Sequence, residues 1–341
     1  MKKLLFVILI ILISGFIQSF ELKKVLEFGS DHDENYLIFQ PGPMVADQQG
    51  NIYQVDRETL VIRKYDQAGR FLARNGRKGQ GPQEFMSIGC LVIQQDKLIA
   101  YDFSMKRITW LDHDLNFLGS DSLPQATGNQ VAANNDFIIY ESMNNYIKEI
   151  TMRYKNGNAT KVAYSASNFG KYEKYRKSPL FFVIFRYLLA VNQDSGEWLA
   201  TLAKPLSGKM ELIFFDAKGA LLHKVETESI VEDYTFDERL LDRATFSKAV
   251  GGKSLTIFKQ PFYLNVKTTL LEYIYEIGNS KISEWILIDN NSGRILDRYE
   301  NMGDLIAYVQ GNRAYGYIMD SDDVEIKIGV YDIVWGHGET K

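Results

Sequence analysis

Histidine and cysteine are the residue types in this chain that could hold a transition metal or attack a substrate. The four histidines are His32, His113, His223 and His337. They are widely separated, and no two of them have the spacing of a metal-ligand pair. The single cysteine, Cys90, stands in an apolar stretch and is predicted to be a small buried side chain. No G-x-S-x-G motif marks a serine nucleophile, so the sequence contains no linear catalytic motif, and we expect no cofactor.

An acidic run near the start of the chain could bind a cation. Asp31, Asp33 and Glu34 stand on either side of His32, and carboxylate oxygens are ligands that Ca²⁺ prefers. A cluster of charges in a loop is usually a solvated surface, however. We therefore expect no resident metal, and these three carboxylates are the candidates if a cation is bound.

Residues 76–85 (GRKGQGPQEF) form a glycine-rich segment of the kind that could cradle a phosphate. The segment lacks the Gly-Lys-Ser/Thr ending of a P-loop, and it leads into a strand-like apolar run instead of a helix. We therefore interpret it as a tight connection between strands. Its basic residues, Arg77 and Lys78, are candidates for contact with an anionic ligand.

Residues 171–177 (KYEKYRK) are basic and aromatic, and side chains of this kind stack on sugars and peptides. Tyr172, Tyr175 and Arg176 are the candidates for such a contact. One interpretation is that they form the lip of a binding funnel. The alternative is that they pack against a second, acidic segment, residues 226–242.

The acidic segment contains a helix signal. Residues 235–238 (TFDE) fit a capping box, which predicts a short helix that extends to about residue 250. Leu240, Leu241 and Ala244 would share one side of this helix.

These segments lie between copies of a repeated unit. Residues 51–72 have the pattern of three short alternating strands, and the pattern recurs 46 positions later, where Asp56 matches Asp102. The second half of the unit recurs at residues 213–222 and 286–296. An Asp-x-x-Gly turn separates its strands, because Asp can accept bonds from the backbone ahead of it and Gly accepts positive φ. The unit predicts an antiparallel meander.

Six units can be counted from their turns, which fall at Asp66, Asp112, Lys155, Asp216, Asp289 and Asp332. Units of about 40 to 75 residues match the period of propeller blades. The last unit lacks an outer strand, whereas residues 22–28 form a strand with no blade before it. Pairing the two removes both unpaired edges. We therefore predict an all-β fold, a six-bladed β-propeller of four-stranded antiparallel meander blades whose ring is closed by the N-terminal strand.

The glycine-rich segment, with the repeats around it, resembles the G-x-x-G-x-G-P-x-E-F loop of exported bacterial six-bladed β-propeller proteins, which are similar to NHL-repeat and TolB-like propellers. The repeats cover nearly all of the chain after residue 20, although the loop motif is well formed only once. The resemblance implies a binding or scaffold module. The alternative is a propeller hydrolase or lyase, similar to a lactonase, with carboxylates in the axial channel.

Long connections between blades identify the expected working face. In a meander propeller, every connection from an outer strand to the next inner strand emerges on the same face. The long connections are residues 31–41, 76–85, 169–179 and 226–253. Because loops on a rigid scaffold carry function, we expect a glycan, a peptide or an envelope protein to bind there. The 39 basic and 43 acidic residues argue against a nucleic-acid partner.

Residues 1–19 have the pattern of a signal peptide. Lys2 and Lys3 precede the apolar run 4–17, and Ser19 is a small residue suited to cleavage. An uncleaved anchor is the alternative, but the run is shorter than the roughly 20 residues of a membrane span. No cysteine follows the run, so a lipoprotein is not expected. We therefore expect a periplasmic or extracellular monomer whose residues 20–341 form one domain.

Overall fold

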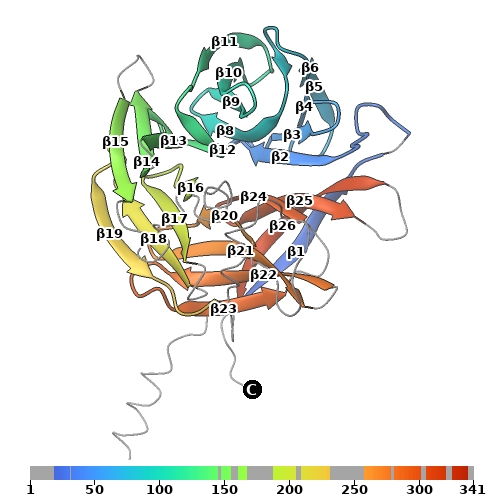
Figure 1. Cartoon of the computed structure of the whole chain (residues 1–341). Helices are drawn as coiled ribbons and strands as arrows, with labels where there is room; N and C mark the ends of the chain where they lie inside the picture. Colours follow the sequence, from blue (N-terminus) through green and yellow to red (C-terminus); the bar gives the residue numbers. More distant parts are fainter. Residues whose placement is uncertain are drawn as a thin grey trace, which may run out of the picture.

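A computed structural model describes residues 19–30, 32–144, 147–154, 160–166, 187–204, 209–230, 257–277, 280–300, 305–319 and 325–336. These residues form six four-stranded antiparallel sheets arranged in a ring, together with a two-stranded parallel ribbon (Figure 1). The fold is therefore the predicted six-bladed β-propeller. Within the described ranges, no helix has the length and apolar character needed to cross a membrane.

The first three blades follow one another along the chain. Blade 1 contains β2 (Pro41–Ala46), β3 (Ile52–Asp56), β4 (Val61–Tyr65) and β5 (Phe71–Asn75). Blade 2 contains β8 (Ile88–Gln94), β9 (Lys97–Asp102), β10 (Arg107–Asp112) and β11 (Phe117–Ser122). Blade 3 contains β12 (Ala126–Ala133), β13 (Phe137–Asn144), β14 (Ile147–Tyr154) and β15 (Thr160–Ala166). The ribbon of β6 (Arg77–Lys78) and β7 (Glu84–Phe85) lies between blades 1 and 2 in the chain.

The other three blades complete the ring. Blade 4 contains β16 (Tyr187–Val191), β17 (Trp198–Lys204), β18 (Lys209–Phe215) and β19 (Leu221–Glu226). Blade 5 contains β20 (Ile257–Tyr263), β21 (Thr268–Ile277), β22 (Ser280–Asp289) and β23 (Ile295–Glu300). Blade 6 contains β24 (Leu305–Gln310), β25 (Arg313–Met319), β26 (Ile326–Gly336) and β1 (Ser19–Phe28). The chain therefore closes the ring with its first strand, as predicted.

The closing strand is longer at its start than the predicted residues 22–28. β1 pairs with β26 from Ser19 opposite Gly336 to Phe28 opposite Ile328. The prediction ended the third strand of this blade at Asp332, but β26 continues to Gly336, and its extra residues give the start of β1 a partner. The ring of Phe20 is buried against Tyr299 and Trp335, at centroid distances of 5.4 and 5.9 Å.

Burial explains the pattern of the strands. Every residue of β3, the second strand of blade 1, is buried, because this strand lies between two neighbouring blades. The outer strands β5, β11 and β19 alternate between half-buried and exposed residues, as expected for strands with one face in solvent. In the described part of the chain, each of six apolar clusters joins two adjacent blades. Hydrophobic contact between blades is therefore what holds the ring together.

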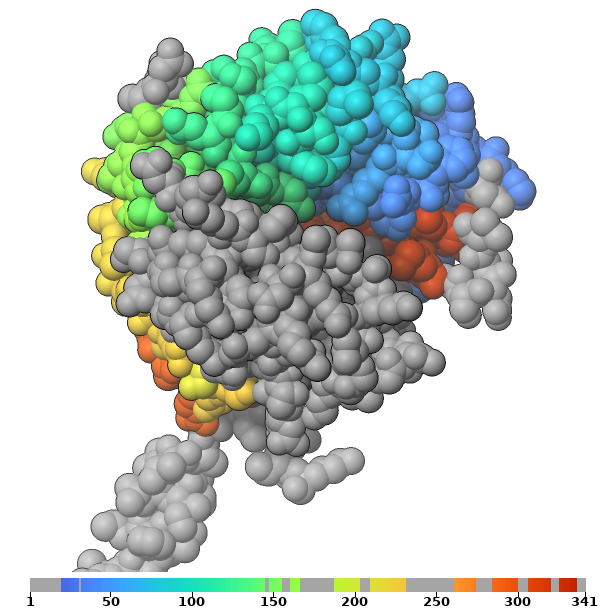
Figure 2. Space-filling view, viewed as in Figure 1, coloured from blue at the N-terminus to red at the C-terminus, as the bar shows by residue number. Residues whose placement is uncertain are grey.

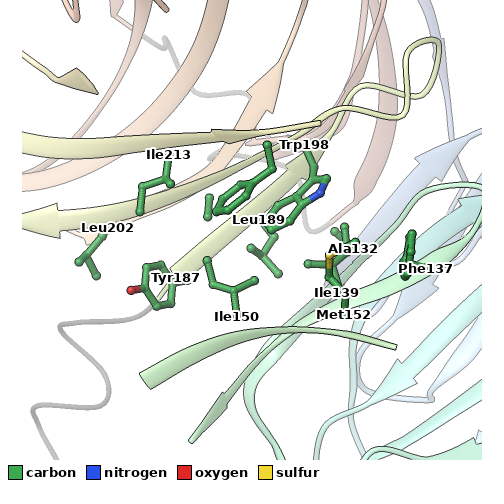
Figure 3. Close-up of a cluster of buried hydrophobic side chains, with 12 residues drawn as sticks. Ala132, Phe137, Ile139, Ile150, Met152, Tyr187, Leu189, Trp198, Leu202 and Ile213 are labelled. Carbon is green, nitrogen blue, oxygen red and sulfur yellow. The ribbon is translucent and has the colours of Figure 1, made fainter. Parts of the chain in front are cut away.

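The cluster between blades 3 and 4 shows how two blades interlock (Figure 3). Ile139 and Met152 of blade 3 lie against Leu189 and Trp198 of blade 4. The Trp198 ring also stacks on Phe215 within its own blade, at a centroid distance of 3.8 Å and an interplanar angle of 7°. Large flat side chains therefore fill the wedge-shaped space between blades.

Turns that begin with Asp recur in four blades: two have the spacing Asp-x-x-Gly, one has Leu in place of Gly, and one is a residue longer. The first-position carboxylates of Asp66, Asp112, Asp216 and Asp289 each accept backbone N–H bonds from the turn that follows. Gly69, Gly219 and Gly293 have φ values of 78°, 80° and 72°. In blade 2, Leu115 takes the same place with a φ of 65°. The equivalence of Gly69 and Gly219, which the repeat predicted, is therefore confirmed.

Replacing either Gly69 or Gly219 with Val is expected to destabilise the ring strongly. A Cβ at Gly219 would lie 2.1 Å from Met152 Sδ, and one at Gly69 would lie 2.6 Å from the Phe28 ring. The clash adds to backbone strain of about 1–3 kcal/mol. Gly311→Val is the control. Gly311 also has a positive φ, 56°, but a Cβ there would have no atom within 4 Å. This variant therefore measures the cost of backbone strain without a clash. Urea unfolding midpoints for Gly69→Val and Gly219→Val that equal the Gly311→Val value would contradict this account.

Candidate functional site

The two faces of the ring carry different chain connections. Each inner strand begins at the end where the chain arrives from the previous blade, which we call the loop face. Each inner strand ends at the hairpin that leads to the second strand, and we call this end the turn face. The second strands run antiparallel to the inner strands, so they end on the loop face.

The glycine-rich loop is closed by its own residues. Gly79 N donates to Phe85 O at 3.0 Å, and the Glu84 carboxylate accepts bonds from Gly81 N and Arg77 Nε, both at 2.8 Å. These contacts, with the backbone N–H of Gly81 first, lower the pKa of Glu84. A Cβ at Gly79 would lie 2.2 Å from Glu84 Oε2, so only glycine fits there. The loop leads into β8 and is a structural connection, as the sequence predicted.

Arg77 and Lys78, the predicted anion contacts, are both exposed on this loop. The Arg77 guanidinium lies 2.6 Å from Glu84 Oε1 while its side chain remains 78% exposed. Arg107 of β10 fastens the loop to blade 2 by donating to the Gln80 and Glu84 carbonyl oxygens. The charge of Arg77 thus already has a partner within the loop.

Buried carboxylates end the second strands of blades 1 and 2. Asp56 has no exposed surface and accepts backbone N–H bonds from Phe39, Gln40 and Glu58 at 3.1–3.3 Å. Asp102, also fully buried, accepts the corresponding bonds from Met86, Ser87 and Met105 at 2.6–3.2 Å. Each carboxylate therefore ties the chain that enters its blade to the turn after its second strand.

In blade 3 the buried carboxylate is Glu141, which lies within β13 and has a charged partner. Lys148 Nζ donates to both of its carboxylate oxygens, at 3.1 and 3.2 Å, and both side chains are buried. Tyr187 N, at the start of blade 4, donates to Glu141 Oε2 at 2.7 Å, and the Thr127 hydroxyl lies 3.1 Å from Oε1. All three of these carboxylates are therefore engaged in holding connections between or within blades.

Exposed apolar side chains stand at the loop-face ends of blades 6, 1, 2 and 3. We call this set the loop-face arc; it consists of Phe39, Met86, Phe103, Met143 and Met319, which are 36–58% exposed. Two of them stand two residues before an inner strand, and the others lie at the end of a second strand. Figure 2 shows the described surfaces of blades 1 to 3 as one continuous region, coloured blue to green. The arc was not predicted from the sequence, because its five residues come from separate segments of four blades that share no motif.

A cavity of about 120 Å³ lies on the axis of the ring, at the turn face. Its lining comes from the second half of all six inner strands and from the hairpins after β16 and β24. Side chains that bear hydrogen-bonding groups there are Gln130, Asn192, Gln193, Asp194 and Gln310, in addition to Cys90, Tyr263 and Tyr308. Among the described lining residues, Asp194 is the one carboxylate, and there is no histidine. Burial raises the pKa of the Cys90 thiol to about 12, so this thiol stays protonated.

The other predicted site residues are distributed as follows. Tyr172, Tyr175, Arg176, Asp31 and the predicted helix at 235–250 lie outside the described residues. Asp33 Oδ1 accepts a bond from Asn35 N at 2.9 Å, and Glu34 pairs with Arg74 at 3.3 Å. In the described ranges, no three His, Cys, Asp or Glu side chains are grouped to hold a metal ion.

Comparisons with known proteins agree with this architecture. A family model described as a 6-bladed beta-propeller matches residues 33–191, from the connection before blade 1 to the inner strand of blade 4. The sequence matches none of the curated proteins.

Three solved structures share the fold at low sequence identity. One is a protein of Bacteroides fragilis described as exported (TM-score 0.56, 11% identity, covering 93% of this chain and 95% of that one). The second is a DUF4221 family member from Bacteroides vulgatus (0.54, 8%, 93% and 99%). The third is the PQQ-bound aldose sugar dehydrogenase of Streptomyces coelicolor (0.51, 11%, 94% and 100%). At these identities the likeness concerns the fold alone.

Proposed function

We propose that this protein is an exported binding or scaffold module that engages a peptide segment of an envelope protein on its loop face. The observation that carries the proposal is the loop-face arc, five apolar side chains exposed on four consecutive blades. Exposed apolar groups that gather on one surface are typical of interaction sites. Methionine and phenylalanine suit such a site, because methionine adapts its shape and phenylalanine supplies a large rigid contact.

The charges beside the arc favour an acidic partner. Arg57, Lys78 and Lys106 are exposed on the loop-face connections of blades 1 and 2, and Lys78 is one of the predicted anion contacts. The described acidic residues of the same connections are Asp33, Glu34, Glu58 and Glu84. Glu34 is already paired with Arg74 and Glu84 with Arg77, and Asp33 accepts an N–H bond from Asn35. A segment with apolar and acidic residues would therefore complement this surface better than a neutral glycan.

The alternative of a hydrolase or lyase needs free carboxylates around the axis. Asp56, Asp102 and Glu141 are buried and accept bonds from backbone N–H groups or from Lys148, so their oxygens are engaged in structure. A carboxylate held in this way is a poor general base because its lone pairs are occupied. Asp194 is the one described carboxylate that lines the axial cavity, and one carboxylate does not supply the acid and base pair of such an enzyme, so a binding role is favoured.

Export is the second part of the proposal. It rests on the signal-peptide pattern of residues 1–19 and on the similarity to a Bacteroides fragilis protein described as exported. We propose that cleavage after Ser19 leaves Phe20, the buried aromatic residue of β1, at the start of a periplasmic or extracellular monomer.

A displayed peptide library tests the binding proposal. We expect the protein beginning at Phe20 to enrich peptides that combine apolar and acidic residues. The triple variant Phe39→Ser, Met86→Ser, Phe103→Ser should bind them at least about tenfold more weakly, because a few side chains carry most of the binding energy of an interface and a tenfold loss is about 1.4 kcal/mol. The measurement is the Kd of the enriched peptides by calorimetry.

The matched control places the same substitution on the outer rim. Leu72, Leu118 and Leu222 are 49–51% exposed on the outer strands, and their triple Ser variant should bind like the wild type. A third variant, Tyr172→Ala, Tyr175→Ala, Arg176→Ala, tests whether the predicted funnel residues belong to the same surface. Equal binding by the arc variant and the wild type, or no enriched peptide at all, would overturn the proposal.

A further inference from the structure

We propose that the axial cavity at the turn face is a second binding site, for a small neutral polyhydroxylated molecule of about the size of a monosaccharide. The cavity lies at the opposite end of the inner strands from the loop-face arc, so the inference is independent of the proposed function. Three properties of the lining support it: small side chains that leave space, amide side chains that can bond hydroxyl groups, and little charge.

Small residues leave the space. Ala132 and Ala133 at the end of β12, Ala190 in β16 and Gly311 after β24 all line the cavity. Neighbouring inner strands lie side by side around the axis, and a larger side chain at these positions would fill the space between them. Leu91, Ile93 and Leu189 provide much of the apolar wall. An apolar wall with a few well-placed polar groups is the usual composition of a small-molecule site.

Amide side chains supply the hydrogen-bonding groups. Gln130 in β12 and Gln310 in β24 come from blades that face each other across the axis. Gln193 lies in the hairpin of blade 4, where the Asn192 oxygen already accepts N–H bonds from Asp194 and Ser195. Gln130 Oε1 is inaccessible and has no hydrogen-bond partner within the described structure. A buried acceptor without a partner is costly, and a rotation of the amide that brings this oxygen to the cavity surface would let a donor from a bound molecule satisfy it. Amides both donate and accept, as hydroxyl groups do.

The lining selects against ions. Asp194 is the one described carboxylate of the cavity, and it lies in an exposed hairpin. The raised pKa of the Cys90 thiol and the burial that raises the pKa of the Tyr308 hydroxyl keep both groups neutral at physiological pH. A dicarboxylate would meet no described cationic side chain in the lining, and a metal ion would meet a single carboxylate. A neutral molecule is the class that fits.

The volume limits the size of the ligand. A water molecule needs about 10–15 Å³ of such space, so 120 Å³ accommodates about ten water-sized groups. A pentose or hexose has about this number of non-hydrogen atoms. A disaccharide could place only one of its rings inside.

Saturation-transfer NMR and calorimetry test the site with defined probes. The panel contains D-glucose, D-galactose, D-mannose, D-xylose and myo-inositol, with D-glucuronate as the charged member and indole as the apolar one. We expect at least one neutral sugar or inositol to bind. If glucose binds, its charged counterpart glucuronate should bind at least about tenfold more weakly. Indole should not compete with the bound sugar. No binding by any neutral member, or preference for indole, would overturn the inference.

Variants locate the binding within the molecule. Gln130→Leu and Gln310→Leu should each weaken binding about tenfold or more, and Ala190→Leu should abolish it by filling the cavity. Gln49→Leu is the matched control, because Gln49 is exposed in the hairpin after β2, on the same face but outside the lining. Gln193→Leu, in a hairpin, provides a test if a strand variant fails to fold. Unchanged sugar binding in folded cavity variants would contradict the assignment.

The two binding proposals can fail separately. The loop-face variant Phe39→Ser, Met86→Ser, Phe103→Ser should retain full sugar binding, because its residues lie at the opposite ends of the strands. The Ala190→Leu variant should retain peptide binding. Loss of sugar binding in the loop-face variant would show that the sugar binds elsewhere and would overturn the cavity assignment alone.

Discussion

Deletion of residues 22–28 is expected to abolish the cooperative unfolding of the whole ring. The deletion removes most of β1, so β26 becomes an unpaired edge and two blade interfaces lose apolar residues together. Phe28 lies 5.0 Å from the Tyr65 ring of blade 1, and Leu22 packs in the cluster between blades 5 and 6. Full burial of a Leu or Phe side chain contributes about 1.5–3 kcal/mol, and Leu22, Leu26 and Phe28 are half-buried. With the lost strand pairing, the deletion removes a large part of the total stability of a domain, about 5–15 kcal/mol.

Thermal unfolding followed by circular dichroism, with limited proteolysis, measures this effect. The matched control removes residues 2–18 instead, which lie before β1, and should unfold like the parent chain. A synthetic peptide of residues 19–28 added to the deletion variant should restore protease resistance, whereas a scrambled peptide should not. A sharp transition at the parental temperature in the deletion variant would refute the role of β1.

Replacing Asp102 with Ala is expected to cost about 2–4 kcal/mol of folding stability. The substitution leaves the N–H groups of Met86, Ser87 and Met105 without their acceptor, and each unsatisfied group costs about 1–3 kcal/mol when water cannot replace the bond. Asp102→Asn should cost less, because its amide oxygen can still accept some of these bonds. Asp56→Ala should behave like Asp102→Ala, since both residues make the same kind of contact.

Urea unfolding midpoints measure the difference. Asp216→Ala is the matched control: its carboxylate accepts N–H bonds from Lys218 and Ala220 in an exposed turn, where water can take its place. We expect the control to lose about 1 kcal/mol or less. If Asp102→Ala is no more destabilising than Asp216→Ala, the buried carboxylate does not hold the incoming chain.

The architecture could be predicted from the sequence because the repeat encodes it locally. The Asp-x-x-Gly turns fix where the strands reverse, and the match of Gly69 with Gly219 holds in the structure because both need positive φ. Closure of the ring followed from counting strands, since a missing outer strand at one end matched an extra strand at the other. The predicted end of the last strand, Asp332, was four residues too early. β1 begins earlier than expected, and its first residues pair with the extra residues of β26.

The candidate sites could be predicted much less well. The match of Asp56 with Asp102 was visible in the sequence, but their partners are backbone N–H groups, which carry no sequence signal. Gln130 and Gln310 become neighbours of one cavity only when six strands from distant parts of the chain meet around an axis. Part of the loop-face arc could have been predicted by aligning the blades, because Phe39 and Met86 both stand two residues before an inner strand.

The pairing of β1 with β26 also determines when the protein can finish folding. β1 is the first part of the ring to be synthesised and β26 is the last, so the contact between Phe20 and Trp335 spans almost the whole chain. Contacts between such distant residues slow folding, because the intervening chain must be ordered first. Blades 1 to 5 can form during synthesis, but blade 6 cannot. The ring therefore stays open until β26 has been synthesised and can pair with β1.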